Sequence, residues 1–246
     1  MYIEFKKGIY LPIVDSTNNY IQTNNISFGT WVIAEDQTNG RGRKGKIWHS
    51  LGKSKIFFSA KILLKRSENP LTIFPLLIAF SIYKTILTFF PHHRESLKIK
   101  WPNDIYLDEN KIAGILIESN SQNDSESIIV LGIGINLSGD TSNDKDFKYS
   151  FLTNTAFDKE QKVRFVEFLI NEINNLEPIF NSQERFLETL NLIDPISYLK
   201  NKEIQFTYEN EIRIGKYIGI DKNGFLLILS DKNTITLLDY SDIKVL

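Results

Sequence analysis

The chain has 246 residues, enough for one or two domains, and its 29 basic and 30 acidic side chains give a formal charge of −1. This balance disfavours binding of nucleic acid over the whole surface, and a hydrophobic content of 42% excludes a wholly disordered chain. Without Cys, disulfides, thiol nucleophiles and Cys-ligated metals are excluded; with only three His, at 49, 92 and 93, His-rich metal sites are disfavoured.

The most membrane-like stretch of the sequence covers residues 71–90. It is long enough to span a bilayer, but it contains Pro75, and Lys84 places a charge inside the apolar run, where a charge is costly. The N-terminal residues also lack the continuous apolar core of a signal peptide. We therefore expect a buried core helix over 70–90 in a soluble, cytoplasmic protein.

Hydrophobic periodicity and turn residues predict the other elements in chain order. Before the core helix they are an edge strand within 1–15, a short helix capped by residues 15–17, a strand over 30–35, a loop rich in Gly and cations over 36–54, and a strand over 56–64. After it they are a strand over 97–101, a hairpin over 105–107 and 112–118, a polar turn over 119–127, a strand over 128–137, a loop over 138–146, and helices over 159–180 and 182–191.

The pattern changes near residues 194–201. Beyond them come the short strand patterns IQFTY, IRIGKYIGI, FLLILS, TITLLDY and IKVL, separated by turn pairs such as Asn223-Gly224. Short strands at regular spacing predict a small antiparallel barrel at the C-terminal end.

The segment over 40–46, GRGRKGK, satisfies G-x-G-x-x-G and most of the P-loop pattern. Both interpretations fail on context, because a strand rather than a helix follows and Ile47 stands where a P-loop has Ser or Thr. The three glycines allow close approach of a ligand, and the four cations repel one another until an anion such as a phosphate orders them. The alternative is a solvated basic loop.

A second cluster of unusual residues is formed by KWPND over 100–104 and KIAGILIE over 111–118. Lys111 lies in an apolar strand, so its charge needs an anion, carbonyl groups or water, and a ligand carboxylate would satisfy it in a pocket. Gly114, Gly132 and Gly134 lie in strands, where glycine suggests close approach of a ligand or another backbone. The alternative is an exposed Lys beside a hairpin, with glycines that only let strands cross.

Together these segments resemble the biotin–protein ligases. The match runs in order through DSTN (15–18), AEDQTNGRGRKGKIWHS (34–50), KWPNDIYLDENKIAGILIES (100–119) and GIGIN (132–136). The resemblance implies an α+β fold: a mixed β-sheet with packed helices, of the class II aminoacyl-tRNA synthetase and biotin ligase type, followed by a small SH3-like β-barrel. It implies a catalytic biotin- and ATP-binding domain over 1–195 and an SH3-like domain over 196–246.

Longer members of that family carry a DNA-binding helix-turn-helix domain ahead of the catalytic domain. Only 14 residues precede Asp15, so we expect the monofunctional type, which binds no DNA. Two loop positions that are commonly Arg in the family are Lys44 and Lys46 here. The charge is kept, but the bidentate geometry of a guanidinium is lost, so these two residues would act on a phosphate only as point charges.

The resemblance implies a two-step reaction with ATP, Mg²⁺ and biotin: the biotin carboxylate attacks the α-phosphorus to give biotinyl-5′-AMP, and a lysine of an acceptor protein then takes the biotin. We expect Lys111 and Arg43 to be catalytic and Asp104 to help hold Mg²⁺ on the ATP phosphates. The implied biotin-binding residues are Ser16, Thr17, Gln37, Gly40, Arg41, Lys111, Gly114 and Gly132. The implied adenylate-binding residues are Arg43, Lys44, Lys46, Trp48, Asn103 and Asn136.

Several of these residues also have ordinary structural interpretations: Ser16 and Thr17 as a helix cap, Trp48 as a core residue and Asn136 as a turn residue. The rival functions are a lipoate–protein ligase, which shares the fold, and a nucleic-acid-binding module, which the acidic residues of the C-terminal barrel disfavour. The expected acceptor is the biotin carboxyl carrier domain of an acetyl-CoA or pyruvate carboxylase. A homodimer is possible, and no membrane contact is expected.

Overall fold

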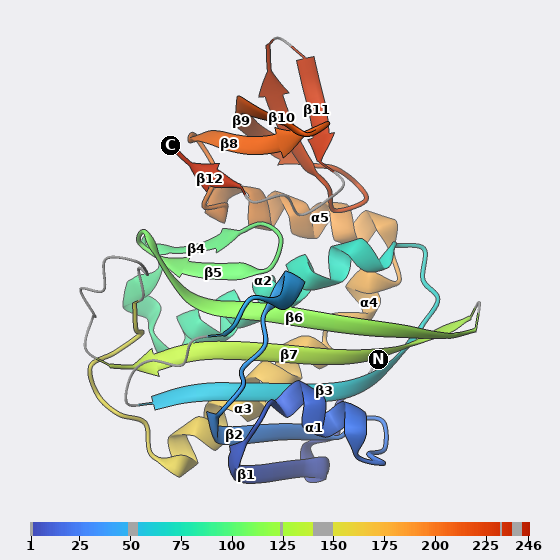
Figure 1. Cartoon of the computed structure of the whole chain (residues 1–246), viewed down its shortest axis with the longest axis vertical. Coiled ribbons are helices and arrows are strands. Elements are labelled where there is room, and N and C mark those ends of the chain that lie inside the picture. Colours follow the sequence, from blue (N-terminus) through green and yellow to red (C-terminus); the bar gives the residue numbers. More distant parts are fainter. Residues whose placement is uncertain (1, 49–53, 124, 140–149, 232, 238–242) are drawn as a thin grey trace.

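The computed structural model describes residues 2–48, 54–123, 125–139, 150–231, 233–237 and 243–246. Its larger part is a seven-stranded sheet in the order β1-β2-β3-β7-β6-β5-β4 (Figure 1). The strands are β1 (Gly8–Val14), β2 (Trp31–Gln37), β3 (Ser54–Lys65), β4 (Leu97–Lys100), β5 (Asp104–Leu107), β6 (Asn110–Asn123) and β7 (Glu126–Ser138). Strand β1 pairs with β2 in parallel, and the remaining neighbours in this order pair in antiparallel fashion, so the predicted mixed sheet is confirmed.

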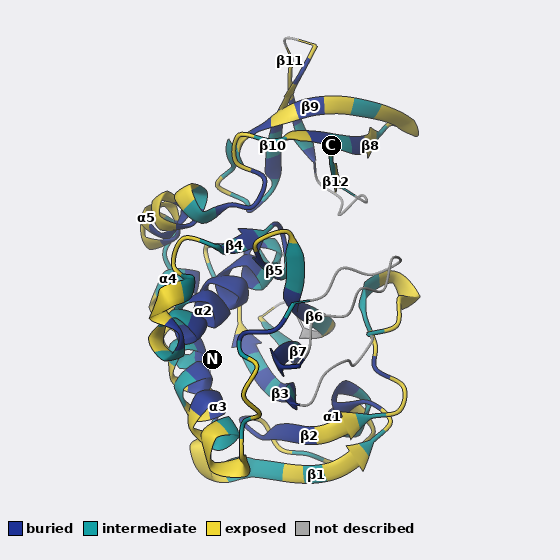
Figure 2. Cartoon of the chain, turned by 90° about the vertical axis from the view of Figure 1, so that its left-hand side faces the viewer, coloured by how far each residue is buried: buried dark blue, intermediate teal, exposed yellow. Residues whose placement is uncertain are grey.

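Two long helices cover one face of this sheet, and a short helix lies on the other (Figure 2). We call these the helix face and the cavity face. The helices are α1 (Thr17–Thr23), α2 (Phe74–Phe89), α3 (Lys159–Asn174), α4 (Glu177–Phe180) and α5 (Gln183–Ile193). Short 3-10 turns lie at Phe5–Lys7, Arg43–Gly45, Leu71–Ile73, Pro91–His93 and Asp194–Ile196. Helix α1 lies on the cavity face, and α2 and α3 cover the helix face.

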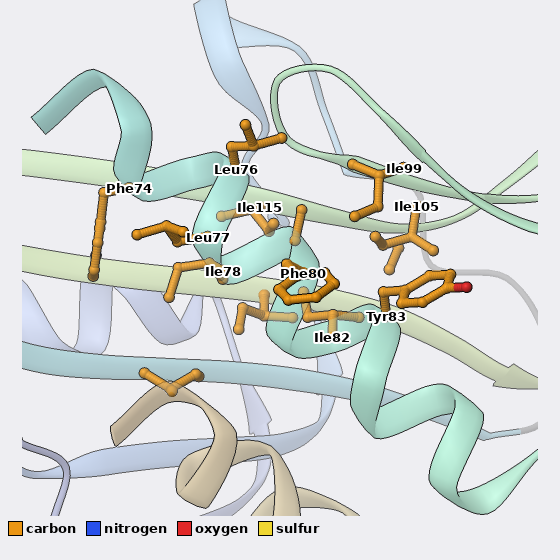
Figure 3. Packing of buried hydrophobic residues seen from close by; sticks show 14 of the residues in the cluster. Phe74, Leu76, Leu77, Ile78, Phe80, Ile82, Tyr83, Ile99, Ile105 and Ile115 are labelled. Carbon is orange, nitrogen blue, oxygen red and sulfur yellow. The ribbon is translucent and has the colours of Figure 1, made fainter. Parts of the chain in front are cut away.

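Helix α2 is the predicted core helix. The apolar span Leu71–Phe89 is long enough to cross a membrane, but 67% of its most apolar window is buried inside the protein. Figure 3 shows its side chains against Ile99, Ile105 and Ile115, which come from three strands of the sheet. Lys84 forms an ion pair with Glu172 of α3, so a carboxylate of the neighbouring helix neutralises the charge inside the apolar run.

The C-terminal end forms a second sheet with the order β11-β10-β9-β8-β12, all antiparallel, which fits the predicted SH3-like unit. Its strands are β8 (Glu203–Tyr208), β9 (Glu211–Ile220), β10 (Leu226–Ser230), β11 (Asn233–Leu237) and β12 (Lys244–Val245). The predicted turn at Asn223-Gly224 is confirmed, with Gly224 in the left-handed region (φ 81°). This turn rests on the larger part: Trp101 Nε1 donates to Gly224 O at 2.8 Å, and Thr72 Oγ1 donates to Asn223 O at 2.7 Å.

Two predicted boundaries are wrong. The polar segment 119–127 is mostly strand, because β6 and β7 stay paired from Ser119↔Ile129 out to Asn123↔Glu126. The helix predicted over 159–180 ends at Asn174, and α4 forms a separate turn with Pro178 near its start, where the missing N–H of proline costs nothing. The predicted loop over 138–146 and the predicted strand TITLLDY lie partly outside the described residues. His49 lies outside them as well.

Candidate active site

A cavity of about 410 Å³ opens on the cavity face of the large sheet. Its walls come from α1, the segment around residues 40–48, strands β3, β6 and β7, and the turn between β4 and β5. The predicted site residues that line it are Ser16, Thr17, Gln37, Arg41, Arg43, Lys44, Lys46, Trp48, Asn103, Asp104, Lys111, Gly114 and Gly132. Segments more than a hundred residues apart in the sequence therefore meet in one space.

Residues 40–48, which we call the flap, form a small hairpin rather than an irregular loop. Trp48 N donates to Gly40 O at 2.9 Å, and Gly42 N donates to Lys46 O at 2.7 Å. At the tip, Lys44 (φ 53°) and Gly45 (φ 74°) both adopt the left-handed conformation, which Gly45 accepts without strain. The flap thus carries its cations on a tight turn over the cavity. Ordering of this segment by an anion stays a prediction.

The glycines of β6 and β7 form a floor into which bulky side chains fit. Gly114 and Gly134 are paired across the two strands. A Cβ added at Gly114 would lie 2.6 Å from the indole of Trp48, and one at Gly134 would lie 2.5 Å from it. Since real Cβ atoms do not approach so closely, both positions require glycine. Trp48 therefore packs on the glycine floor of the cavity, which differs from the core position considered as its ordinary role.

A polar pocket lies where α1 meets the sheet. Thr17 donates to Gln37 Oε1 from its backbone N at 2.7 Å and from its hydroxyl at 3.1 Å. Ser59 Oγ lies 2.8 Å from Thr17 Oγ1 and 2.5 Å from Asn18 Oδ1. Ser16 occupies the N-cap position of α1 as predicted, but its side chain makes no capping hydrogen bond. The side chains available here are small, neutral donors and acceptors, which suit a neutral polar ring.

Lys111 and Asp104 form an ion pair in the wall of the cavity. Their Nζ and Oδ1 atoms are 2.7 Å apart, and Lys111 Nζ also lies 5.2 Å from the centre of the Trp48 ring. The carboxylate of Asp104 thus pairs with the positive charge of Lys111, for which the sequence alone named no partner. Among the described residues no group of three His, Cys, Asp or Glu side chains could hold a metal ion, so the structure offers no side-chain cage around Asp104.

The turn between β4 and β5 supports the flap tip. Arg43 NH1 donates to Asn103 Oδ1 at 3.0 Å, and Asn103 Nδ2 donates to Ile115 O at 2.8 Å. Asn103 is therefore fixed to β6 on one side and holds an arginine over the cavity on the other. Such a guanidinium is suited to a phosphate, which it can bind with two parallel hydrogen bonds.

Two predicted site residues do not line the cavity. Gly40 lies at the base of the flap, where a Cβ would come within 2.8 Å of Trp48 O, so glycine is needed there for the hairpin itself. Asn136 lies on β7 with only 3% of its surface exposed. It is a strand residue rather than a turn residue.

Sequence reasoning missed several cavity residues, among them Asn18, Lys100, Tyr106 and Ile243. Lys100 Nζ lies 5.1 Å from the centre of the Tyr106 ring and 5.8 Å from that of Tyr198. Burial raises the pKa of Tyr106 far above its ordinary value, so its phenol stays neutral. Asn18 and Lys100 belong to the motifs DSTN and KWPND, and these motifs were the available signal.

Comparisons with known proteins agree with this geometry. Residues 10–136 match the model of the biotin/lipoate A/B protein ligase family. The chain is 27% identical over 224 residues to the bifunctional ligase/repressor BirA of Escherichia coli, covering 90% of this chain and 68% of that protein. It is 35% identical over 117 residues to the biotin–[acetyl-CoA-carboxylase] ligase of Paracoccus denitrificans, covering 46% of this chain and 47% of that one.

Among solved structures, the biotin protein ligase of Aquifex aeolicus in complex with biotin and ATP superposes with a TM-score of 0.80. That match covers 98% of this chain and 99% of the Aquifex chain at 27% identity. The family model matches more than half of the chain and includes α1, the flap, the Lys111–Asp104 pair and the glycine floor. The chain belongs to the biotin/lipoate A/B protein ligase family.

Proposed function

We propose that the chain is an ATP-dependent biotin–protein ligase, which forms biotinyl-5′-AMP and then transfers the biotin to a lysine of a carrier protein. One observation carries this proposal: a single cavity joins a neutral polar pocket at Thr17 and Gln37 to a cationic region at Lys111 and the flap. A ligand with a polar ring at one end and a carboxylate at the other fits this order of groups. Because the chain is similar to biotin ligases, we propose that this ligand is biotin.

In the first step, an oxygen of the biotin carboxylate attacks the α-phosphorus of ATP, and pyrophosphate leaves. Because an anion must approach a polyanion, nearby cations lower the barrier by neutralising the negative charge that builds up. Lys111 is the residue we assign to this role, and its pairing with Asp104 fixes its ammonium in the cavity. Arg43, held by Asn103, is assigned to the phosphates. Lys44, Lys46 and Trp48 complete the proposed nucleotide side.

Mg²⁺ would enter with ATP, bound mainly by phosphate oxygens and water. Asp104 was predicted as a helper for the metal, but in the structure its carboxylate is paired with Lys111. We therefore propose that Asp104 acts on the metal at most indirectly, and that it serves first as the counter-ion of Lys111.

In the second step, the amine of the acceptor lysine attacks the acyl carbon of the adenylate, and AMP leaves. The mixed anhydride is sensitive to water, and the flap lines the cavity, where it would shield this bond. We propose a biotin carboxyl carrier domain as acceptor, from an acetyl-CoA or pyruvate carboxylase. The division into 1–195 and 196–246, the monofunctional type and the cytoplasmic location stay predictions, as does a homodimer.

The test is incubation of the protein with biotin, Mg-ATP and a purified biotin carboxyl carrier domain, followed by mass spectrometry of the carrier. We expect a mass increase of one biotinyl group on one lysine, and none when ATP is left out or the acceptor lysine is replaced by Arg. A parallel reaction with lipoate and a lipoyl domain distinguishes the two branches of the family. Modification by lipoate alone would overturn the proposal.

A further inference from the structure

Glu118 lies within β6, and its carboxylate joins this strand to two other segments. Its Oε2 accepts a hydrogen bond from Asn18 Nδ2 at 2.8 Å, and its Oε1 lies 2.5 Å from Arg41 NH2. Asn18 belongs to α1 and Arg41 to the base of the flap. The side chain of Glu118 is 24% exposed, and it is not among the residues that line the cavity.

Arg41 is bound at the base of the flap by a second acceptor. Its NH1 lies 2.5 Å from Asn19 Oδ1, and Asn19 Nδ2 donates to Asp15 Oδ2 at 2.8 Å. Arg41 is also paired across the hairpin with Ile47. Two nitrogens of the guanidinium are therefore committed to protein acceptors, although Arg41, like the residues of the flap tip, also lines the cavity.

Asn18 connects Glu118 with the polar pocket. It is only 3% exposed, and a Cβ added at Gly132 would lie 2.3 Å from its Oδ1, so the two are in close contact. The same Oδ1 lies 2.5 Å from Ser59 Oγ, which in turn lies 2.8 Å from the hydroxyl of Thr17. A shift of Asn18 would thus move the hydroxyl of Thr17 from its position.

From this network we propose that Glu118 is a positioning residue for biotin, an inference that rests on the ligase function proposed above. Its carboxylate fastens the base of the flap to α1 through Arg41, and it orients the polar pocket through Asn18. Arg41 then contributes its side chain as an anchor of the flap, rather than as a contact to the ligand. Because the groups that receive the ligand are held before it arrives, less ordering is needed on binding.

A purely structural role for the same carboxylate would lower the melting temperature and weaken the binding of both biotin and ATP. The positioning role predicts otherwise. Partly exposed ion pairs contribute little to folding stability, so the loss of Arg41–Glu118 would hardly lower the melting temperature. A positioning role instead shows itself in the KM for biotin. The nucleotide groups around Arg43 and Asn103 make their own contacts, so the KM for ATP serves as an internal reference.

The experiment measures biotin-dependent ATP–pyrophosphate exchange in Glu118→Ala, Glu118→Gln, Arg41→Ala and the double variant Glu118→Ala/Arg41→Ala. We expect Glu118→Ala to raise the KM for biotin about 5- to 20-fold, a range typical of coupling between sites. The turnover number and the KM for ATP should change less than about threefold, which separates binding from chemistry. Glu118→Gln keeps an oxygen for Asn18 but loses the charge toward Arg41, so its effect should be intermediate.

The double variant tests the pairing of Glu118 with Arg41. If both residues act through one contact, its KM for biotin should exceed that of the worse single variant by less than about twofold. The matched control is Glu172→Gln, which breaks the Lys84–Glu172 ion pair on the helix face and should leave the KM for biotin unchanged.

The inference alone would be overturned by an active wild-type protein whose KM for biotin is unaffected by Glu118→Ala, or by fully multiplicative effects of the two single substitutions. A fall in melting temperature together with a rise in the KM values for both biotin and ATP would also overturn it, in favour of a structural role. A wild-type protein with no biotin-dependent exchange would instead overturn the proposed function, and the inference would fall with it.

Discussion

The two faces of the seven-stranded sheet use the same strands for opposite purposes. On β7, Leu131, Ile133 and Ile135 belong to the apolar core under α2 and α3, whereas Gly132 and Gly134 lie beneath Asn18 and Trp48 on the cavity face. Because side chains alternate along a strand, one segment builds the core and the floor of the site together. Residues that stabilise the fold and residues that bind the ligand therefore alternate along one strand, instead of lying in separate domains.

The faces also differ in how tightly they are filled. The helix face is packed with large apolar side chains that are almost entirely buried. The cavity face keeps about 410 Å³ open, and its glycines leave room for an indole and an amide. Substitutions on the helix face should therefore act on folding, and substitutions on the cavity face on binding and catalysis.

The largest expected effect is that of Lys111→Ala on the cavity face. Loss of the ammonium leaves Asp104 and the reacting anions without their nearest positive charge. We expect biotin-dependent ATP–pyrophosphate exchange to fall by about 10³-fold, the loss seen when a preorganised charge-stabilising group is removed. The melting temperature should stay within about 3 °C of wild type, since the side chain lies at a cavity rather than in the core. Exchange near the wild-type rate would refute the role of Lys111.

The opposite pattern is expected for Phe74→Ala on the helix face. Phe74 is fully buried and meets Phe180 edge to face, with ring centres 5.7 Å apart. Removing the ring leaves a hole and should lower the free energy of unfolding by ~3–5 kcal/mol, measured by urea denaturation. Below the melting temperature the KM for biotin should be unchanged. A raised KM without loss of stability would break the division between the faces.

A smaller effect, confined to the nucleotide, is expected for Arg43→Ala at the flap tip. The variant loses the hydrogen bond to Asn103 and one bidentate phosphate donor. We expect the KM for ATP to rise about tenfold, equivalent to ~1.4 kcal/mol, with the KM for biotin nearly constant. Free biotinyl-5′-AMP, detected by chromatography, should accumulate in solution. If ATP use and adenylate retention are both unchanged, the flap is only a solvated basic segment.

The sequence predicted those elements whose pattern is local. The apolar run around α2 predicted the core helix, and the apolar patterns of β2, β3 and β7 predicted three strands of the large sheet. The segment 119–127 was predicted as a turn because its composition is polar, yet it continues β6 and β7, whose partner strand overrides local preference. The hairpin of the flap likewise depends on backbone pairing between Gly42 and Lys46, for which glycine-rich sequence gives no specific sign.

In the site, the motifs identified the segments but not the contacts. Lys111 was expected in a pocket from its apolar surroundings, but its partner Asp104 was assigned to a metal. Asn18 and Glu118 were not predicted, because their hydrogen bond joins residues 100 positions apart and Glu118 alone looks like an ordinary strand residue. Cross-strand and helix-to-strand contacts of this kind follow from the register of the sheet, which short motifs do not encode.

The smallest expected effect concerns Asp15, where the chain enters α1 on the cavity face. Hydrogen bonds from the Asn19 side chain and from the backbone of Ser16 hold the pKa of Asp15 below its ordinary value of 3.8. A carboxyl group with a lowered pKa in the folded protein stabilises it fully above the unfolded value, and this contribution is lost as the pH falls through the folded value.

Asp15→Asn should therefore lower the urea midpoint slightly at pH 7, and the difference from wild type should shrink as the pH falls below about 4. Because Asn19 also accepts from Arg41, a second consequence is a small rise in the KM for biotin, well below that of Glu118→Ala. Urea midpoints at several pH values, with Asp231→Asn in the turn that follows β10 as the control, would measure the first effect. A difference that persists undiminished at the acidic end would mean that Asp15 acts by packing and not by charge, and the cavity face would then resemble the helix face at this edge.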